Sequence, residues 1–326
     1  MMRASFFIIL FLFCSPLFAN DPIRPVNTYS IVAYDSVAGE MGVAVQSHWF
    51  QVGTVVSWAE AGVGVVATQS FVEISYGPLG LELMRAGKTA PEALEALLKI
   101  DPQREVRQVA MVDANGNVAV HTGKNCIREA GHSKGKGFSV QANLMEKSSV
   151  WPAMEKAYLE TKGDLLSRLM ASLEAAEAEG GDIRGKQSVA ILIVPVKTKG
   201  QPWREKLVDL RIDDHAQPLK EIARLIKIHR AYEHMNKGDE YMAIDQIQNA
   251  LKEYSFANKL YPENVEILYW TAATMAGVGK VEQAMPLFKQ VFEKEPVWKE
   301  VTKRLPAAGL LPNDPELMKQ ILGSDK

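Results

Sequence analysis

Two short runs of alternating residues open the part of the chain that is expected to fold. Residues 28–34 (TYSIVAY) and 40–47 (EMGVAVQS) are rich in β-branched residues, and residues 35–39 between them end in glycine. Such runs, separated by a short loop that contains glycine, are typical of a β-hairpin. Residues 52–58 and 63–69 continue the pattern across another glycine-containing turn. We therefore expect these four segments to form one antiparallel sheet.

Helices and strands then alternate in blocks. Thr89 and Glu92 have the spacing of a capping box, in which each side chain binds a backbone amide at the start of a helix. Apolar residues at helical spacing predict helices at residues 78–86, 91–99, 151–159 and 165–179. Further strands are expected at residues 106–113, 117–123, 137–143, 188–194 and 206–213. This order predicts an α+β fold with two sheets between helical layers.

From residue 218 onward the pattern is helical alone. Between Val265 and Pro296, small and aromatic residues fall at the places used by the helix-turn-helix pattern of a tetratricopeptide repeat. A less regular unit precedes it, and the twelve residues from Gly238 to Ala250 predict that its second helix is about two turns longer. Because three repeats are normally needed for stability, the tail is expected to pack on the first domain or on a partner. A tail that only stabilises the first domain is the alternative.

Composition narrows the class of protein. A length of 326 residues favours two folded units, at about 150 residues each. The hydrophobic fraction of 47% and the charged fraction of 23% exclude a disordered chain and a polytopic membrane protein. The net charge of −2 disfavours a nucleic-acid partner, which basic proteins bind through phosphates. Cys14 and Cys126, the two cysteines, are too few for a disulfide scaffold.

Residues 1–19 have the organisation of a secretory signal peptide. Arg3 supplies a positive charge, residues 6–13 form an apolar run, and Ala19 offers a small residue at the cleavage point. The run is shorter than the roughly 20 residues of a membrane-spanning helix, so we expect no stable membrane insertion after cleavage. An uncleaved anchor is the alternative. Residues 20–27 would then form an N-terminal extension of a periplasmic or secreted protein.

Seven strings in a fixed order carry a family resemblance. They are TYSIVAYDSVAGEMGVAVQS, AEAGVGVVATQSFVEISYGPLGLELM, REVRQVAMVDANG, HTGKNC, AGH, GGDIRGKQSVA and LRIDDH. This segment resembles the domain of unknown function family 1028, which is similar in fold to the N-terminal nucleophile hydrolases. The resemblance implies a four-layer αββα sandwich over residues 28–217, and the residue pattern places a tetratricopeptide-like, all-α helical-hairpin tail over residues 218–326. The biochemical activity of the family is not established.

The fold class implies a particular chemistry at Thr28, the first residue of the first strand. A threonine there acts as the nucleophile and uses its own free α-amine, with a pKa of about 8, as the general base. A signal-peptidase cut after Ala19 would leave eight residues in front of Thr28, and the nitrogen of a peptide bond cannot act as a base. Thr28 is therefore a candidate only if the Asn27–Thr28 bond is cut, by self-processing or by another protease. Otherwise Thr28 is a β-branched residue that opens a strand.

Two helpers for Thr28 are expected at the ends of neighbouring strands. Ser47 ends the second strand, and a hairpin would bring it beside Thr28 to orient the hydroxyl or relay a proton. His48 adds a titratable group next to it. Gln69, near the end of the fourth strand, is the preferred oxyanion or substrate contact. Each of these side chains is otherwise an ordinary polar residue at a strand end.

Four further residues are candidates for substrate binding. Gln141 and Asn143 alternate on one strand, so their side chains face the same side. Asp182 and Arg184 lie in a glycine-rich turn and would hold the ammonium and the carboxylate of a zwitterionic substrate. The alternative is a salt bridge that pins the turn.

No metal and no cofactor are expected. His121, Cys126 and His132 follow a spacing that matches no closed zinc pattern, although a metal-dependent hydrolase stays open as a third interpretation. The glycines at positions 131, 135 and 137 do not follow nucleotide-binding spacing.

Two functions compete. The first is an exported amidohydrolase of the N-terminal nucleophile type that acts on a small amide or peptide. The second is a catalytically inactive envelope binding or scaffold protein, whose repeat-like tail binds a peptide or protein. Whether the protein is an enzyme, and whether it forms homo-oligomers, is left open by the sequence.

Overall fold

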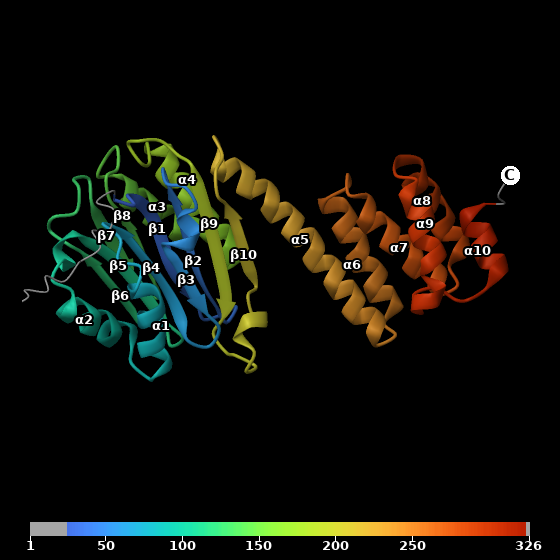
Figure 1. Ribbon diagram of the computed structural model, residues 1–326, viewed down its shortest axis with the longest axis horizontal. Coiled ribbons are helices and arrows are strands. Elements are labelled where there is room, and N and C mark those ends of the chain that lie inside the picture. Colours follow the sequence, from blue (N-terminus) through green and yellow to red (C-terminus); the bar gives the residue numbers. More distant parts are fainter. Residues whose placement is uncertain (1–24, 324–326) are drawn as a thin grey trace, which may run out of the picture.

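The computed structural model describes residues 25–323, which divide into a sheet-rich part and a helical tail. Figure 1 shows the two parts side by side, joined by the long helix α5 (Pro218–Ala243). The signal peptide expected at residues 1–19 and residues 20–24 of the expected extension lie outside the described residues. Within residues 25–323, no helix has the length and apolar character needed to cross a membrane.

The strands of the described chain form two antiparallel sheets. The six-stranded sheet has the order β10-β9-β2-β1-β8-β7, and the four-stranded sheet has the order β3-β4-β5-β6. The bounds are β1 Thr28–Asp35, β2 Glu40–Ser47, β3 Ser57–Glu60, β4 Gly64–Ser70, β5 Arg107–Asp113, β6 Val118–Thr122, β7 Gly131–Gly135, β8 Phe138–Ala142, β9 Ser188–Pro195 and β10 Val208–Ile212. The expectation of an α+β fold with antiparallel sheets, followed by an all-helical region, is confirmed.

Each face of the six-stranded sheet is buried. Successive side chains of a strand point to opposite faces, and β1 shows the consequence directly. Ile31 packs in the cluster that faces helices, whereas Val32 packs in the cluster shared with the four-stranded sheet. The two sheets therefore face each other across a common apolar core, to which Val65 and Val112 contribute from the four-stranded sheet.

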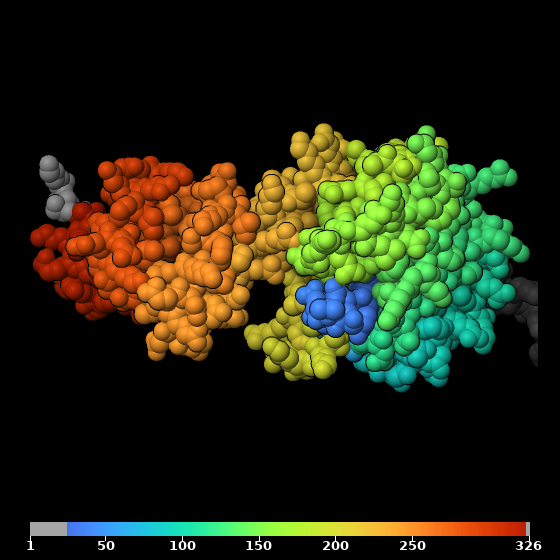
Figure 2. All heavy atoms as spheres, turned by 180° about the vertical axis from the view of Figure 1, so that it is seen from behind, coloured from blue at the N-terminus to red at the C-terminus, as the bar shows by residue number. Residues whose placement is uncertain are grey.

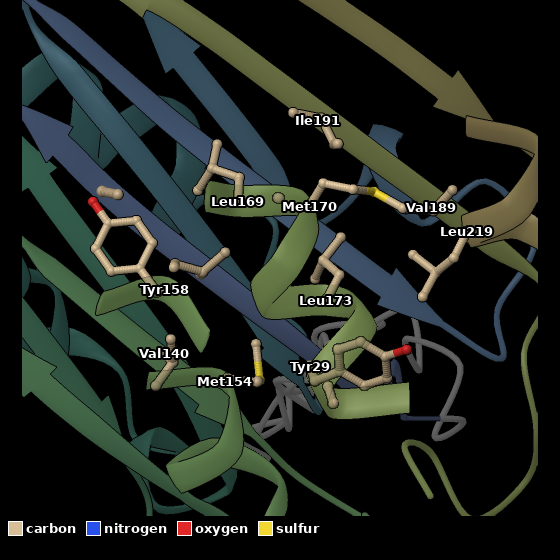
Figure 3. Packing of buried hydrophobic residues seen from close by; sticks show 14 of the residues in the cluster. Tyr29, Val140, Met154, Tyr158, Leu169, Met170, Leu173, Val189, Ile191 and Leu219 are labelled. Atoms are coloured by element: carbon tan, nitrogen blue, oxygen red, sulfur yellow. The ribbon is translucent and has the colours of Figure 1, made fainter. Parts of the chain in front are cut away.

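Helices cover the outer face of each sheet. Helices α1 (Tyr76–Arg85) and α2 (Ala90–Ile100) pack on the four-stranded sheet, and α3 (Val150–Glu160) and α4 (Leu165–Ala178) pack on the six-stranded sheet. Figure 3 shows Met154, Leu169 and Leu173 of these helices close to Val140 and Ile191 of the strands. The Thr89–Glu92 capping box at the start of α2 is confirmed.

The prediction that the first four segments form one sheet is wrong. Strands β1 and β2 belong to the six-stranded sheet, whereas β3 and β4 belong to the other. Gln51 has a left-handed backbone (φ 57°) and begins the short 3-10 helix η1 (Val52–Thr54) where a strand was expected. Gly53 allows this turn, because a Cβ there would lie 2.6 Å from the Cβ of Ala190. The chain thus crosses from one sheet to the other at η1.

Strand β7 has no counterpart in the sequence-based expectations. It forms the edge of the six-stranded sheet, and its side chains at His132 and Lys134 are exposed. Such an edge strand carries polar residues, which discourage pairing with another chain. It therefore lacks the apolar alternation by which the other strands were found.

The tail is built of helical hairpins. Helix α5 pairs with α6 and α7 pairs with α8, and the bounds are α6 Ile247–Leu260, α7 Val265–Gly277, α8 Val281–Lys294, α9 Val297–Arg304 and α10 Pro315–Leu322. Short 3-10 helices occur at η2 Arg104–Val106, η3 Pro202–Arg204 and η4 Pro306–Ala308. The beginning of α5 packs on the six-stranded sheet through Ile222, and its later part packs in the tail through Met235.

The prediction of a longer second helix in the upstream helical unit is wrong. Helices α6 and α8 both have 14 residues, whereas α5 has 26. Gly238 lies inside α5 and not in a turn, and the ring of Tyr254 packs directly against it. The extra residues therefore lengthen the first helix of the hairpin.

Candidate active site

The start of β1 and the end of β2 meet at one end of the six-stranded sheet. Thr28 lies opposite Ser47 in the antiparallel register, because the short turn at residues 36–39 joins the two strands. Both side chains are fully buried. The residues proposed as nucleophile and helper are therefore direct cross-strand neighbours.

The carbonyl oxygen of Asn27 is held by two hydrogen-bond donors. Ser47 donates from Oγ at 2.5 Å, and Arg184 donates from Nη2 at 2.9 Å. This oxygen belongs to the peptide bond that precedes Thr28. Donors placed in this way stabilise the negative charge that develops on a carbonyl oxygen when its carbon is attacked. The sequence indicated Asn27 as the residue in front of the bond to be cut, but it gave no sign of the donors that hold the Asn27 carbonyl oxygen.

The segment in front of Thr28 is fixed in the described structure. Val26 forms an isolated antiparallel bridge with Ser70, through hydrogen bonds of 2.7 and 3.0 Å. The Thr28 hydroxyl donates to the carbonyl oxygen of Val26 at 2.9 Å. In the full-length chain, the peptide bond in front of Thr28 is therefore buried and flanked by residues that hydrogen bonds hold in place.

The side-chain amide of Asn27 is buried and has no hydrogen-bond partner within the described protein. Its Nδ2 and Oδ1 atoms, and also Oδ1 of Asn143, have no hydrogen-bond partner within the described protein. Buried polar groups without a partner cost about 1 to 3 kcal/mol each. Release of Asn27 from this position would therefore relieve an unfavourable contribution to stability.

Gln69 engages the backbone of Thr28 from the other side. Its Nε2 donates to the carbonyl oxygen of Thr28 at 3.1 Å and to Oε1 of Gln108 at 2.7 Å. Its Oε1 accepts a hydrogen bond of 2.6 Å from Ser30. Because both ends of this amide are engaged inside the protein, Gln69 positions the Thr28 backbone.

Gln141 and Asn143 extend the same buried network. Gln141 donates to Oγ of Ser30 at 2.6 Å, and Asn143 donates to Oε1 of Gln108 at 2.9 Å. Both side chains are fully buried. Gln108, which was not identified from the sequence, lies opposite Gln69 in the sheet register. The sequence feature that could have indicated Gln108 is its position as the one polar residue before an apolar run of four.

Asp182 and Arg184 are bound to each other. The guanidinium of Arg184 donates to both carboxylate oxygens, at 3.0 Å from Nε and 2.7 Å from Nη2. Asp182 is buried, and it also accepts from the backbone amide of His48 at 3.2 Å. The pair thus pins the turn, as the alternative interpretation held, while Arg184 still reaches the Asn27 carbonyl oxygen.

A cleft of about 560 Å³ opens beside Asn27. Trp49, Phe50 and Leu144 contribute apolar walls, and Arg184 contributes the charged one. Figure 2 shows the sheet-rich part, in blue to yellow, and the helical tail, in orange to red, from behind. A volume of this size is typical of a small-molecule or peptide side-chain site.

Glu177 anchors the turn that carries Asp182. Its carboxylate accepts hydrogen bonds from Tyr29, Gln46 and Lys186, at 2.9, 2.7 and 2.7 Å. Burial acts to raise the pKa of Glu177, but these three hydrogen bonds outweigh burial and hold its pKa below the usual value. This cluster lies behind the candidate site and was not found from the sequence.

His121, Cys126 and His132 have separate hydrogen-bond partners. His121 bonds to the carbonyl oxygen of Arg104 at 2.8 Å, and Cys126 donates to that of Arg107 at 3.3 Å. His132 bonds to Thr122 at 2.9 Å. Burial raises the pKa of the Cys126 thiol. Among residues 25–323, no group of three or more histidine, cysteine or acidic side chains has an arrangement that would hold a metal ion.

Comparison with known proteins places this site within a family. The model described as "Family of unknown function (DUF1028)" matches residues 28–222. The crystal structure of protein SPO2555 from Silicibacter pomeroyi, described with the same family model, is 28% identical, with a TM-score of 0.55. That match covers 62% of this chain and 88% of the other.

A more distant similarity carries less weight. Anbu (ancestral beta-subunit) from Yersinia bercovieri is 12% identical, with a TM-score of 0.30, over 60% of this chain and 91% of that one. This TM-score is too low to support an inference about fold or function. No curated protein matches the chain.

Proposed function

The chain belongs to the family of unknown function DUF1028, and from this premise we propose that it is an exported amidohydrolase of the N-terminal nucleophile type. Thr28 is its nucleophile, and its substrate is a small amide or peptide. The observation that carries this proposal is the double hydrogen bond from Ser47 and Arg184 to the Asn27 carbonyl oxygen. These donors meet at the peptide bond whose cleavage would free the Thr28 amine.

Self-cleavage follows from this geometry in two steps. The Thr28 hydroxyl oxygen attacks the carbonyl carbon of Asn27, and the charge that develops on the carbonyl oxygen is stabilised by Ser47 and Arg184. The bond between this carbon and the Thr28 nitrogen then breaks, while the hydroxyl proton passes to that nitrogen. Water hydrolyses the resulting ester, so that Asn27 ends as a carboxylate and Thr28 regains its hydroxyl with a free amine.

The processed Thr28 repeats the same chemistry on a substrate. Its free amine accepts the hydroxyl proton, and the oxygen attacks the amide carbonyl carbon of the substrate. The proton then leaves with the departing amine, and water releases the acyl group from Thr28. Ser47 and Arg184 stabilise the oxyanion in both reactions, since the acyl group of the substrate takes the place of the Asn27 acyl group.

The layer order supports the fold assignment on which this mechanism rests. Helices α1 and α2 lie outside one sheet, and α3 and α4 lie outside the other, with the two sheets between them. This order is that of the four-layer αββα sandwich in which the first strand carries the nucleophile. The buried amide network around Gln69 and Gln108 holds the Thr28 backbone in place.

The cleft beside Asn27 supports a small amide or peptide as substrate. Its apolar walls at Trp49 and Phe50 suit a hydrocarbon or aromatic portion, and Arg184 orients the carbonyl group. The signal peptide at residues 1–19 would place the enzyme in the periplasm or outside the cell. Residues 20–27 would then form the segment that cleavage removes.

N-terminal sequencing and intact mass of the exported protein test this proposal. We expect a chain that begins at Thr28, and we expect a Thr28→Ala variant to retain residues 20–27 and to lose amidase activity in a screen of amino-acid amides and short peptides. A wild-type chain that still begins at Asn20 after long incubation would exclude the Thr28 mechanism.

A second candidate function is a binding or scaffold protein without catalysis. It is favoured by the bridge between Val26 and Ser70, which holds the segment in front of Thr28 against the sheet. In that case the helical hairpins after residue 218 act as a tetratricopeptide-like tail that binds a peptide or protein. Purification of a stable chain that begins at Asn20, together with a bound partner, would support it.

A further inference from the structure

The helical tail contains a second cavity, which is separate from the cleft beside Asn27. Its volume is about 660 Å³, and its walls come from α5, α6 and α7, with residues 309–310 after η4 at one end. Most of the lining side chains are apolar or aromatic, and the charged ones, Asp239 and Glu266, are both acidic. This cavity has no role in the chemistry proposed for Thr28.

The lining residues of the cavity extend along two helices. Those on α5 run from Tyr232 to Met242, and those on α7 and at its C-cap run from Glu266 to Val278. At about 1.5 Å of rise per helical residue, these stretches are about 15 and 18 Å long. An extended peptide advances about 3.3 Å per residue, so four or five residues would fill this length. The lining along α5 and α7 is therefore long enough for a short extended peptide.

Two carboxylates line the cavity and are held by aromatic donors. Glu266 accepts hydrogen bonds from Tyr232 at 2.8 Å and from Trp270 at 3.4 Å. Asp239 accepts one from Tyr254 at 2.7 Å. An ionised carboxylate has about four acceptor positions, so both groups keep the capacity to bind a further donor.

The charge of this cavity is not balanced by a basic side chain within it. The described residues that line it include no lysine, arginine or histidine, although acidic and basic residues are equal in number from residue 218 onward. Aromatic faces attract ammonium and guanidinium groups, and Trp270 of α7 and Tyr232 of α5 both contact Glu266. Carboxylates beside aromatic rings in an apolar cavity are complementary to a cationic side chain.

We propose that this cavity binds an extended peptide segment of a partner protein and receives one of its arginine or lysine side chains. The cationic group binds the carboxylate of Glu266 beside the rings of Tyr232 and Trp270, and Asp239, seven residues after Tyr232 on α5, adds negative charge farther along the cavity. The apolar walls cover the rest of the segment. The proposal stands whether or not Thr28 is catalytic, because it uses only residues of the tail.

Fluorescence anisotropy with the full exported chain tests this site. The probe is a labelled pentapeptide with one central arginine among alanines, and its control carries citrulline, which has the same shape without the charge. We expect the arginine peptide to bind at least tenfold more tightly than the citrulline peptide. Glu266→Gln should weaken arginine-peptide binding about tenfold, and Asp239→Asn should weaken it less, because Asp239 acts from farther away. Glu263→Gln, an exposed carboxylate three residues before Glu266, should leave binding unchanged.

Several results would overturn the proposal. Equal binding of the two peptides, or no binding of the arginine peptide up to about 1 mM, would exclude a cationic site. If free arginine amide displaces the labelled peptide as well as the unlabelled peptide does, the ligand of this cavity is a small organic cation and not a peptide segment. If Glu266→Gln fails to fold, Asn236→Arg serves instead, because Asn236 is an exposed lining residue. Its new guanidinium should occupy the site and abolish peptide binding; unchanged binding would contradict the proposal.

Discussion

Ser47 donates a hydrogen bond of 2.5 Å to the carbonyl oxygen of Asn27, twenty positions earlier in the chain. Arg184 donates to the same oxygen at 2.9 Å. A neutral and a charged donor thus polarise the carbonyl group of the peptide bond that precedes Thr28. The amide network behind Thr28 holds the following carbonyl oxygen through Gln69. Hydrogen bonds therefore hold the carbonyl groups of both Asn27 and Thr28, and those to Asn27 polarise the carbonyl group that the nucleophile would attack.

Removal of the Ser47 hydroxyl should slow self-cleavage. We expect Ser47→Ala to reduce the rate about 10²- to 10³-fold, because the loss of one oxyanion donor has effects of this size. Intact mass, followed over time on a chain that begins at Asn20, measures the rate. Ser172→Ala is the matched control, since Ser172 is also buried and donates to a backbone carbonyl oxygen, that of Met154. Equal rates for Ser47→Ala and the wild type would exclude the assigned role of Ser47.

Arg184 should have two separable roles. Arg184→Leu leaves the buried carboxylate of Asp182 without its partner, so the free energy of unfolding should fall by about 2 to 3 kcal/mol. The double variant Asp182→Asn/Arg184→Leu should recover at least half of that loss, because no charge remains buried. Self-cleavage should stay slow in both variants, since both lack the donor to Asn27. Urea unfolding and intact mass measure the two properties.

A surface pair provides the control for the Arg184 variants. Arg211 binds Asp209 at 3.0 Å with the same sequence spacing, but both side chains are about one-third exposed. Arg211→Leu should therefore lower the free energy of unfolding by less than about 1 kcal/mol. Rapid self-cleavage by the double variant would show that Arg184 acts only through the stability of the turn.

Local parts of the candidate site were open to prediction from the sequence. Thr28 and Ser47 are cross-strand neighbours because a short turn joins their strands, and alternation within the hairpin sets the register. The contact between Asn27 and Arg184 spans 157 positions, so no local pattern indicates it. The role of Gln108 likewise depends on which strand pairs with β4, a choice that residue spacing leaves open.

The fold shows the same division between local and long-range information. The start of α2 was predicted because its capping residues, Thr89 and Glu92, act within one turn of the helix. The assignment of β3 to the four-stranded sheet was not predicted, because it depends on the close approach of Gly53 to Ala190, which is far along the chain. Strand β7 was missed because an edge strand needs no apolar alternation.

The buried amide network should contribute strongly to stability. Gln108→Leu removes the partner of both Gln69 and Asn143 and leaves buried amide groups without hydrogen bonds. We expect the free energy of unfolding to fall by about 2 to 3 kcal/mol. Denaturant unfolding measures the change, and Gln283→Leu, at an exposed position of α8, should change it by less than about 0.5 kcal/mol. A similar small change for Gln108→Leu would contradict the importance of the network.

The stability of the chain should depend on Glu177 in mildly acidic solution. The pKa of Glu177 is lowered on folding, so ionised Glu177 stabilises the folded state above the usual pKa of glutamate, about 4.3. This contribution is lost as the pH falls through the lowered pKa of the folded state. Glu177→Gln should thus reduce the free energy of unfolding by about 1 to 2 kcal/mol at pH 7. The difference from the wild type should shrink at about pH 3.

Urea unfolding at the two pH values measures the contribution of Glu177. Glu174→Gln changes an exposed glutamate on the same helix and should show no such difference at either pH. A gap between wild type and Glu177→Gln that stays constant from pH 7 to pH 3 would mean that the carboxylate charge does not stabilise the turn.

Two glycines of the tail should respond in opposite directions to the same substitution. A Cβ at Gly238 would lie 2.3 Å from Cε1 of Tyr254, whose ring is buried between α5 and α6. Gly238→Ala should therefore force the two helices apart and lower the free energy of unfolding by about 1 to 3 kcal/mol. At Gly277, the nearest atom to a Cβ is the Leu310 carbonyl oxygen at 4.0 Å. Gly277→Ala should raise that free energy by up to about 0.5 kcal/mol, because alanine favours the helix and Gly277 is the last residue of α7. Thermal unfolding of both variants checks the signs, and destabilisation by both would show that α7 is packed more tightly than described.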